Sequence, residues 1–286
     1  MHNRINKFLD DAYKVQHPFS RNQPGTDIIA KLMPGILSSS EGDLEQYVAK
    51  LEQLLSKNIN CSKCEAKILV YLNIITGQRK YLKRYYEIDL KRNIRSEIYA
   101  SLNSASDCLH NKLPELMSVD EMQLFLKGKL PNIQVPHNLY TVIDVPGILG
   151  GMPKPDRKTD WNALSKIGFK YVVNVESDKP LYDPAPLTFL KCVELQNDMP
   201  ANPKMELIYI NEIVDRAERK IMSGHGVLVH CFGGRGRSGT VIGCILKRLN
   251  YKSKDIIKYL NKLHKQRGKE GWPEFTWQAE VVEKFI

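Results

Sequence analysis

The chain has 286 residues, of which 42% are hydrophobic and 26% charged, and its formal net charge is +10. This is the composition of a globular protein with a buried core, and it argues against a disordered or fibrous chain. The N-terminal run lacks the apolar stretch of a signal peptide, and the longest apolar run, 68–75, is too short to cross a bilayer. Six cysteines are too few for a disulfide framework here and suit a reducing compartment. We therefore expect a soluble, cytoplasmic protein without a transmembrane segment.

Residues 1–135 are predicted to form a helical domain. Apolar residues recur at helical spacing between Leu44 and Leu55, and 65–78 is a second helical segment. Ser118 and Glu121 form a capping-box pattern that predicts a helix over 119–128. Prolines and asparagines over 130–138 then indicate a domain boundary, which we place between 135 and 136. The pattern indicates no role for this domain, although the basic run 79–95 would suit a protein or anionic partner.

Residues 136–286 alternate between strand and helix patterns, which predicts an α/β domain with a central sheet covered by helices on both faces. The expected strands are 141–145, 171–175, 191–196 and 226–230. The expected helices are 161–167, 206–222, 237–249, 254–266 and 275–285.

The loop between the strand 226–230 and the helix that follows it carries the chemistry. Cys231 follows the strand, and Arg237 comes after five further residues. Glycines in the loop allow successive amides to turn inward as an anion nest, and the helix N-terminus adds its positive dipole end. Arg237 can bind a phosphate through two N–H groups, and this positive field stabilises the thiolate of Cys231. The loop therefore predicts a nucleophile held beside a bound phosphate.

The pattern His230-Cys231-x-x-Gly234-x-x-Arg237-Ser238 resembles the signature of the protein tyrosine and dual-specificity phosphatase superfamily. The loop variant is most similar to the kinase-associated (cyclin-dependent kinase inhibitor type) branch, and the resemblance covers about 140–286 only. It implies a cysteinyl-phosphate intermediate with no cofactor and no metal. It also implies that Ser238 helps the thiolate to leave and that the remaining loop residues bind the phosphate: His230, Phe232, Gly233, Gly234, Arg235 and Gly236.

The family uses a general acid on a separate loop upstream of the nucleophile. Asp198 is the candidate, since it follows the strand 191–196 and precedes a helix; Asp183 is a poorer one because it lies before that strand. Gln278 resembles the glutamine that positions the hydrolytic water in some branches, although Gly-Trp-Pro-Glu-Phe before it departs from that pattern. The resemblance also implies that a basic residue within the loop, here Arg235, can favour highly anionic substrates.

Protein phosphotyrosine or phosphoserine/threonine is the expected substrate, with phosphoinositide second, and RNA 5′-phosphate relatives use the same chemistry. Three other interpretations stand beside the enzyme. The run 234–239 fits a dinucleotide-binding pattern, but no acidic residue ends a second strand about 20 positions later. A phosphatase fold that has become a phosphoprotein-binding module usually loses its Cys, Arg or acid, and this chain keeps all three. Four residues, Cys61, Cys64, Cys108 and His110, leave a zinc site open.

Overall fold

The computed structural model describes residues 41–56, 62–88, 112–122, 124, 136 and 138–286. The chain divides into two compact units, Met1–His110 and Asn111–Ile286. No helix in the described ranges is long and apolar enough to cross a membrane.

The described part of the first unit is helical, with α3 over Glu41–Ser56, α4 over Ser62–Thr76 and α5 over Lys80–Glu87. Two of its basic residues, Lys80 and Arg84, form ion pairs within the unit. Glu52 of α3 accepts hydrogen bonds from Lys80 at 3.1 Å and from the Tyr81 hydroxyl at 2.5 Å, and Arg84 pairs with Glu65 at 2.7 Å. Much of the positive charge of the run 79–88 therefore stabilises helix contacts, and residues 89–95 of the same run lie outside the described ranges.

The zinc hypothesis falls mostly on residues that the structure does not describe. Cys64 lies in α4, whereas Cys61, Cys108 and His110 lie outside the described ranges. Within the described part of the chain, no three His, Cys, Asp or Glu side chains are grouped so that they could hold a metal ion.

The second unit is built on one five-stranded sheet in the order β1-β2-β5-β3-β4. β1 pairs antiparallel with β2, and the remaining pairs are parallel. The strands are β1 Tyr140–Ile143, β2 Leu149–Met152, β3 Phe169–Asn174, β4 Thr188–Cys192 and β5 Gly226–His230. The helices are α8 Trp161–Ile167, α9 Pro203–Met222, α10 Gly236–Arg248, α11 Ser253–Gln266 and α12 Thr276–Lys284.

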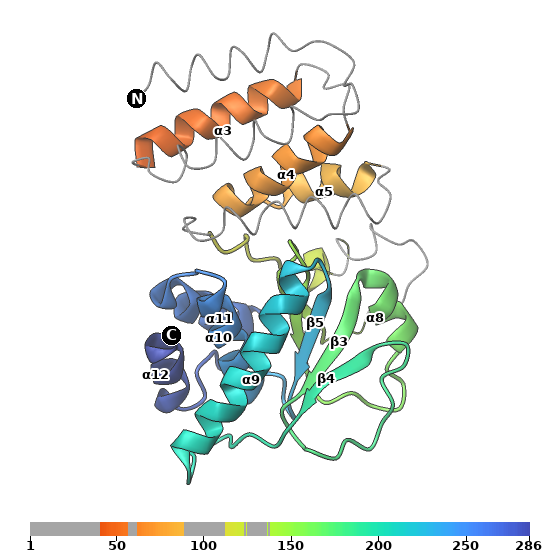
Figure 1. Ribbon diagram of the computed structural model, residues 1–286, viewed down its shortest axis with the longest axis vertical. Helices are drawn as coiled ribbons and strands as arrows, with labels where there is room; N and C mark the ends of the chain where they lie inside the picture. Colours follow the sequence, from red (N-terminus) through yellow and green to blue (C-terminus); the bar gives the residue numbers. More distant parts are fainter. Residues whose placement is uncertain (1–40, 57–61, 89–111, 123, 125–135, 137) are drawn as a thin grey trace. The chain divides into compact units, whose positions relative to one another are not determined.

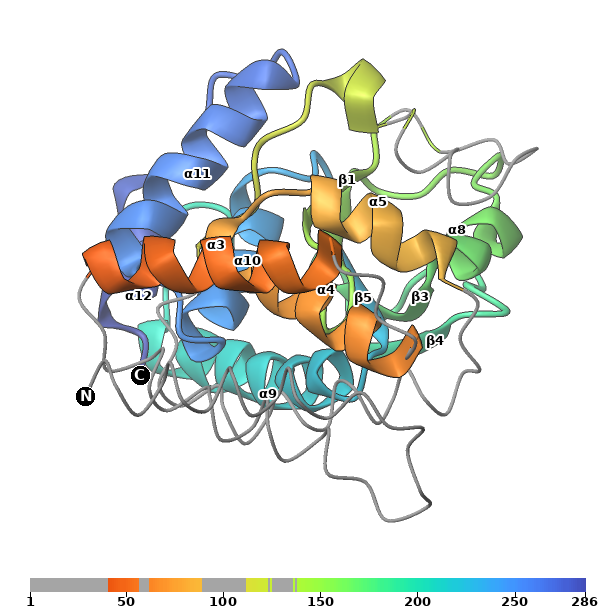
Figure 2. The ribbon, with the colours of Figure 1, turned by 90° about the horizontal axis from the view of Figure 1, so that it is seen from above.

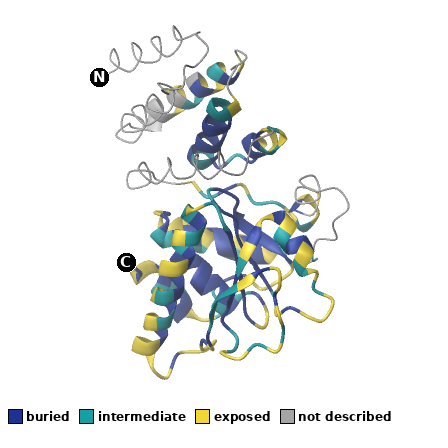
Figure 3. Ribbon diagram, turned by 45° about the vertical axis from the view of Figure 1, so that its right-hand side comes forward, coloured by how far each residue is buried: buried dark blue, intermediate teal, exposed yellow. Residues whose placement is uncertain are grey.

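Side chains of β5 alternate between two buried clusters, so helices must cover both faces of the sheet. Val227 and Val229 belong to the cluster shared with α9, α10, α11 and α12, whereas Leu228 belongs to the cluster shared with α8 and Met122. In Figures 1 and 2, α9 and α10 lie side by side, and α8 lies at the other face. Figure 3 shows the strands between these layers, mostly buried except for β4 at the edge of the sheet, which is partly exposed. The predicted α/β sheet flanked by helices is confirmed.

The short segment before the sheet belongs to the same unit. Ser118 and Glu121 form the predicted capping box, in which the Ser118 amide donates to Glu121 at 2.7 Å and the Glu121 amide donates to Ser118 Oγ at 3.2 Å. Met122 packs beneath the sheet with Met117 at its edge. The second unit thus begins at Asn111, earlier than the boundary expected between 135 and 136.

Candidate active site

The loop 231–235 connects β5 to α10 at the end of the sheet where the parallel strands finish. The carbonyl of His230 accepts a hydrogen bond from the Val175 amide at 3.0 Å, and that of Phe232 accepts one from the Lys154 amide at 3.0 Å. These bonds anchor the loop on both sides of Cys231. The Cys231 side chain is buried at the floor of the loop and joins the core cluster.

Two glycines of this segment, Gly234 and Gly236, lie close against other parts of the chain. Gly234 has φ +64°, and a Cβ there would lie 2.5 Å from the backbone of Met152 and Pro153. A Cβ on Gly236 would collide with the side-chain oxygens of Asn197 and Glu274. The loop is therefore shaped by the close approach of three other segments as well as by its own sequence.

Arg237 and Ser238 place unpartnered donors beside the nucleophile. Arg237 Nη1 donates to the carbonyls of Leu195 at 3.2 Å and Val175 at 3.5 Å, which fixes the guanidinium. Its Nε and the Ser238 Oγ are buried without a hydrogen-bond partner in the structure. Arg235 is the N-cap of α10 and makes no side-chain capping bond. Buried donors are normally paired, so these groups indicate a place for an anion.

Ser238 lies in the first turn of α10, and the N-cap of that helix is Arg235. Its buried hydroxyl remains free to bond the thiolate, as the family resemblance predicts.

His230 lies behind the nucleophile and is held by a stack of aromatic rings. The Tyr182 hydroxyl shares a hydrogen bond with His230 Nε2, and Tyr182 stacks on Trp161 with ring centroids 5.4 Å apart. Phe189 packs against the same tyrosine at 5.3 Å. Burial lowers the pKa of His230 to about 4, so the ring is neutral at pH 7.

Arg235, the basic residue that the resemblance connects with highly anionic substrates, forms an ion pair in the structure. Its Nε donates to Glu274 Oε1 at 2.6 Å, and its Nη1 lies 3.3 Å from Glu270 Oε2. The arginine of the loop that has a free buried donor is therefore Arg237.

The loop that carries Asp198 lies against the phosphate-binding loop. Asp198 is exposed and accepts a hydrogen bond from the Met199 amide at 2.7 Å, while its neighbour Asn197 touches Gly236. The start of this segment is fixed by Glu206 of α9, which accepts a hydrogen bond from the Gln196 amide at 2.7 Å. Burial raises the pKa of Glu206, whereas the Gln196 amide and the charge of Arg237 act to lower it. Asp198 thus lies next to a residue that touches the loop.

Gln278 braces two loops. Its Nε2 donates to the Asn197 carbonyl at 3.1 Å, and its Oε1 accepts from the Glu274 amide at 2.9 Å. Asp183 instead closes a turn of its own, in which its carboxylate accepts a hydrogen bond from the Ala185 amide at 3.0 Å. The carboxamide of Gln278 is therefore occupied by backbone groups in this structure. It still lies beside the segment that carries Asp198.

Several contacts of the site were not predicted. Trp272 is buried, packs against Gly239 and donates its Nε1–H to the Gly236 carbonyl at 3.2 Å. The Tyr140 hydroxyl donates to the Gly234 carbonyl at 3.2 Å. Trp272 and Glu274 come from the same Gly-Trp-Pro-Glu-Phe run that departs from the family pattern, and that departure was the available signal. No sequence pattern indicated that Tyr140 or Tyr182 contacts the site.

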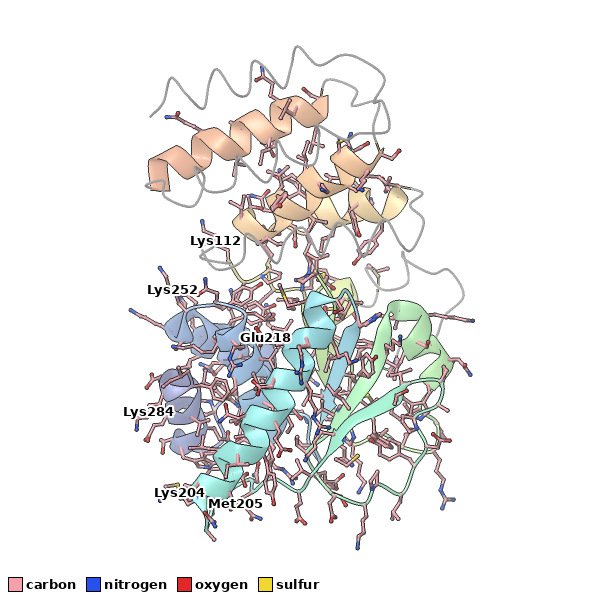
Figure 4. All side chains as sticks on the ribbon, viewed as in Figure 1. Lys112, Lys204, Met205, Glu218, Lys252 and Lys284 are labelled. Carbon is pink, nitrogen blue, oxygen red and sulfur yellow. The ribbon has the colours of Figure 1, made fainter. Side chains whose placement is uncertain are left out.

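The basic residues between Lys247 and Lys269, which follow the loop 231–235 in the sequence, are spread across the unit. Arg248 pairs with Asp215 at 2.7 Å and with Glu218 at 3.5 Å on α9. Figure 4 places Lys252, at the start of α11, at the opposite end of the unit from Lys204, at the start of α9. Because α9 starts where the strands finish, Lys252 lies away from the catalytic loop, and only the later part of α11 turns back toward the segment that holds Glu274.

Part of the chain is similar to known phosphatases. Residues 140–269 match the model of a family described as Swiss Army Knife protein, DSP-PTPase phosphatase domain. The similar solved structures include the core catalytic domain of the PP-IP phosphatase SIW14 from S. cerevisiae, with 13% identity, 54% of this chain and 89% of that chain covered, and TM-score 0.40. They also include Tk-PTP in its active form (23%, 48% and 92%, TM-score 0.36) and a kinase-associated phosphatase (18%, 48% and 85%, TM-score 0.39). Residues 140–269 thus carry the match to a dual-specificity (DSP-PTPase) phosphatase domain.

Proposed function

We propose that the protein hydrolyses phosphate monoesters through a cysteinyl-phosphate intermediate, with phosphotyrosine and phosphoserine/threonine proteins as its substrates. One observation carries the proposal. Cys231 lies at the floor of a loop where Arg237 Nε and Ser238 Oγ are both buried donors without a partner, at the uncapped N-terminus of α10. A bound phosphoryl group supplies the acceptor that these donors lack.

In the first step, the Cys231 thiolate attacks phosphorus, a sulfur–phosphorus bond forms and the ester oxygen–phosphorus bond breaks. The leaving oxygen takes a proton from the Asp198 carboxyl group. Arg237 and the loop amides stabilise the equatorial phosphoryl oxygens throughout the transfer. Asn197 holds the acid loop against Gly236, which supports this role for its neighbour Asp198.

In the second step, water attacks phosphorus while the Asp198 carboxylate accepts a proton from it. The sulfur–phosphorus bond breaks, and the electron pair returns to Cys231 as a thiolate. The buried Ser238 hydroxyl donates a hydrogen bond to that sulfur as its charge develops. The products are inorganic phosphate and the free enzyme, and the cycle needs no cofactor.

The rim of the loop supports a peptide substrate. Phe232 is 68% exposed directly after the nucleophile, and Met199 is 67% exposed directly after Asp198. Apolar side chains in these places suit the ring of a phosphotyrosine or the neighbouring residues of a phosphopeptide. A phosphoinositide head group would instead gain from free cations at the rim, and Arg235 is already paired there.

The test is a turnover panel of phosphopeptides, phosphoinositides and 5′-triphosphorylated RNA with the purified protein. We expect phosphopeptide hydrolysis without added metal, its loss in Cys231→Ser and a strong reduction in Arg237→Lys, because a point charge cannot replace the two-pronged guanidinium. Cys192→Ser makes the same chemical change at a half-buried cysteine of β4 and should retain activity. Turnover that survives in Cys231→Ser would contradict the mechanism, and turnover of phosphoinositide or RNA alone would contradict the substrate.

A further inference from the structure

We infer that Glu274 determines substrate specificity: by holding Arg235 it restricts the site to a single phosphate group and selects against substrates with a second, neighbouring phosphate. The inference rests on the proposed function, since it requires that the loop 231–237 binds a phosphoryl group.

The pair is well formed and shielded. Arg235 Nε and Glu274 Oε1 are 2.6 Å apart, and the two side chains are only 16% and 20% exposed. Glu270, which lies 3.3 Å from Arg235 Nη1, is 91% exposed. An ion pair with little solvent access is screened far less than an exposed one. Glu274 is therefore the partner that fixes Arg235, and Glu270 adds little.

Glu274 is also held in place by its surroundings. Its amide donates to Gln278 Oε1 at 2.9 Å, and Gln278 donates to the Asn197 carbonyl at 3.1 Å. The second carboxylate oxygen of Glu274 lies against Gly236, where no Cβ would fit. The carboxylate is thus fixed at the outer edge of the phosphate-binding loop, between that loop and the acid loop.

The charge balance at this edge is unfavourable for a second phosphate. Arg235 carries one positive charge, whereas Glu274 and Glu270 carry two negative charges between them. A second phosphate would meet a repulsive edge and a guanidinium that is already paired. Without the charge of Glu274, only an exposed carboxylate would compete for Arg235, and the guanidinium could form a charge-assisted hydrogen bond to the second phosphate.

Calorimetric titration of inorganic phosphate and pyrophosphate into the Cys231→Ser protein, which cannot turn them over, tests the inference. Glu274→Gln should tighten pyrophosphate relative to phosphate by about tenfold, the effect of one hydrogen bond to a charged group. The double variant Glu274→Gln with Arg235→Leu should lose that gain. Glu280→Gln, a matched change at an exposed carboxylate of α12, should leave the ratio as it was.

Arg235→Leu alone gives a test that does not depend on Glu274→Gln folding. Because Arg235→Leu leaves Glu274 and Glu270 without their cation, we expect this variant to weaken pyrophosphate relative to phosphate, the opposite direction to Glu274→Gln. A gain of pyrophosphate binding in Arg235→Leu, or an unchanged ratio in folded Glu274→Gln, would overturn the inference while phosphate binding itself stands. Failure of the parent protein to bind phosphate at all would overturn the proposed function, and this inference with it.

Discussion

His264 makes the stability of the phosphatase unit depend on pH. It is fully buried on α11, its ring packs edge-on against Tyr140 at 5.3 Å, and its Nδ1 lies 3.0 Å from Arg267 Nη1. Since a guanidinium can only donate, Nδ1 must be the acceptor and the ring must be neutral. Burial lowers the pKa of His264 to about 3, with further lowering by the charges of Arg267, Arg235 and Lys269. The protonated ring is therefore incompatible with this site.

The sign of the effect follows from proton binding. In the unfolded chain this histidine has a pKa of about 6.5, so below that pH the unfolded state binds more protons than the folded state. The stability is fully present above about pH 6.5 and is lost as the pH falls toward about 3. Between about pH 7.5 and about pH 5, one such histidine costs about 2 kcal/mol. His230, whose pKa burial lowers to about 4, costs about the same over that interval.

Urea unfolding of wild type and His264→Phe at these two pH values measures the effect. All three tryptophans, Trp161, Trp272 and Trp277, lie in the second unit, so tryptophan fluorescence follows that unit alone. Phenylalanine keeps a ring against Tyr140 but cannot titrate. The variant should be less stable at both pH values, yet its loss on acidification should be smaller than that of wild type by about 2 kcal/mol. An equal loss of unfolding free energy on acidification in the two proteins would show that His264 does not cause the pH dependence.

Two further predictions concern the reaction. Asp198→Ala should lower the rate by roughly 10²–10⁴-fold for alkyl phosphates and much less for aryl phosphates with good leaving groups, because only alkyl leaving groups need a proton on departure. An equal loss on both kinds of substrate would indicate that Asp198 is structural and would favour Asp183 as the acid. Reversal of Lys258, Lys262 and Lys265 to Glu should raise KM for an acidic phosphopeptide roughly twofold or more at low salt and spare a small aryl phosphate. Lys252→Glu, at the far end of the unit, is the control, and a salt-independent kcat/KM unchanged by the triple reversal would show that the three lysines play no part.

The sequence predicted most of the phosphatase fold because its pattern is regular. Helix α8 agrees with its expected range, as does strand β5. Strand β2 was missed because Gly150 and Gly151 suggest a loop; they are glycines because Tyr140 crosses so closely that a Cβ on either would collide with it. Strand β4 begins and ends earlier than expected, and its edge position lets its side chains stay partly exposed, which weakens the pattern.

The catalytic loop could be read from the sequence because its parts are contiguous, whereas its supports come from far along the chain. Arg235 pairs with Glu274, which lies 39 positions later in the sequence. Tyr182 meets His230 in the same way across 48 positions. No local pattern encodes such contacts. An acidic residue in a loop is also common as a turn-forming residue. Only the unusual run 271–275 hinted that this part of the site differs.

Trapping the reaction intermediate shows whether Cys231 carries the phosphoryl group. The enzyme is mixed with a fast aryl phosphate, quenched in acid during turnover and digested for mass spectrometry. We expect a phosphoryl group on the peptide that contains Cys231. This modification should be absent from Cys231→Ser and present in Cys192→Ser. Steady turnover with that peptide unmodified, or a phosphoryl group found on a different residue, would contradict the account.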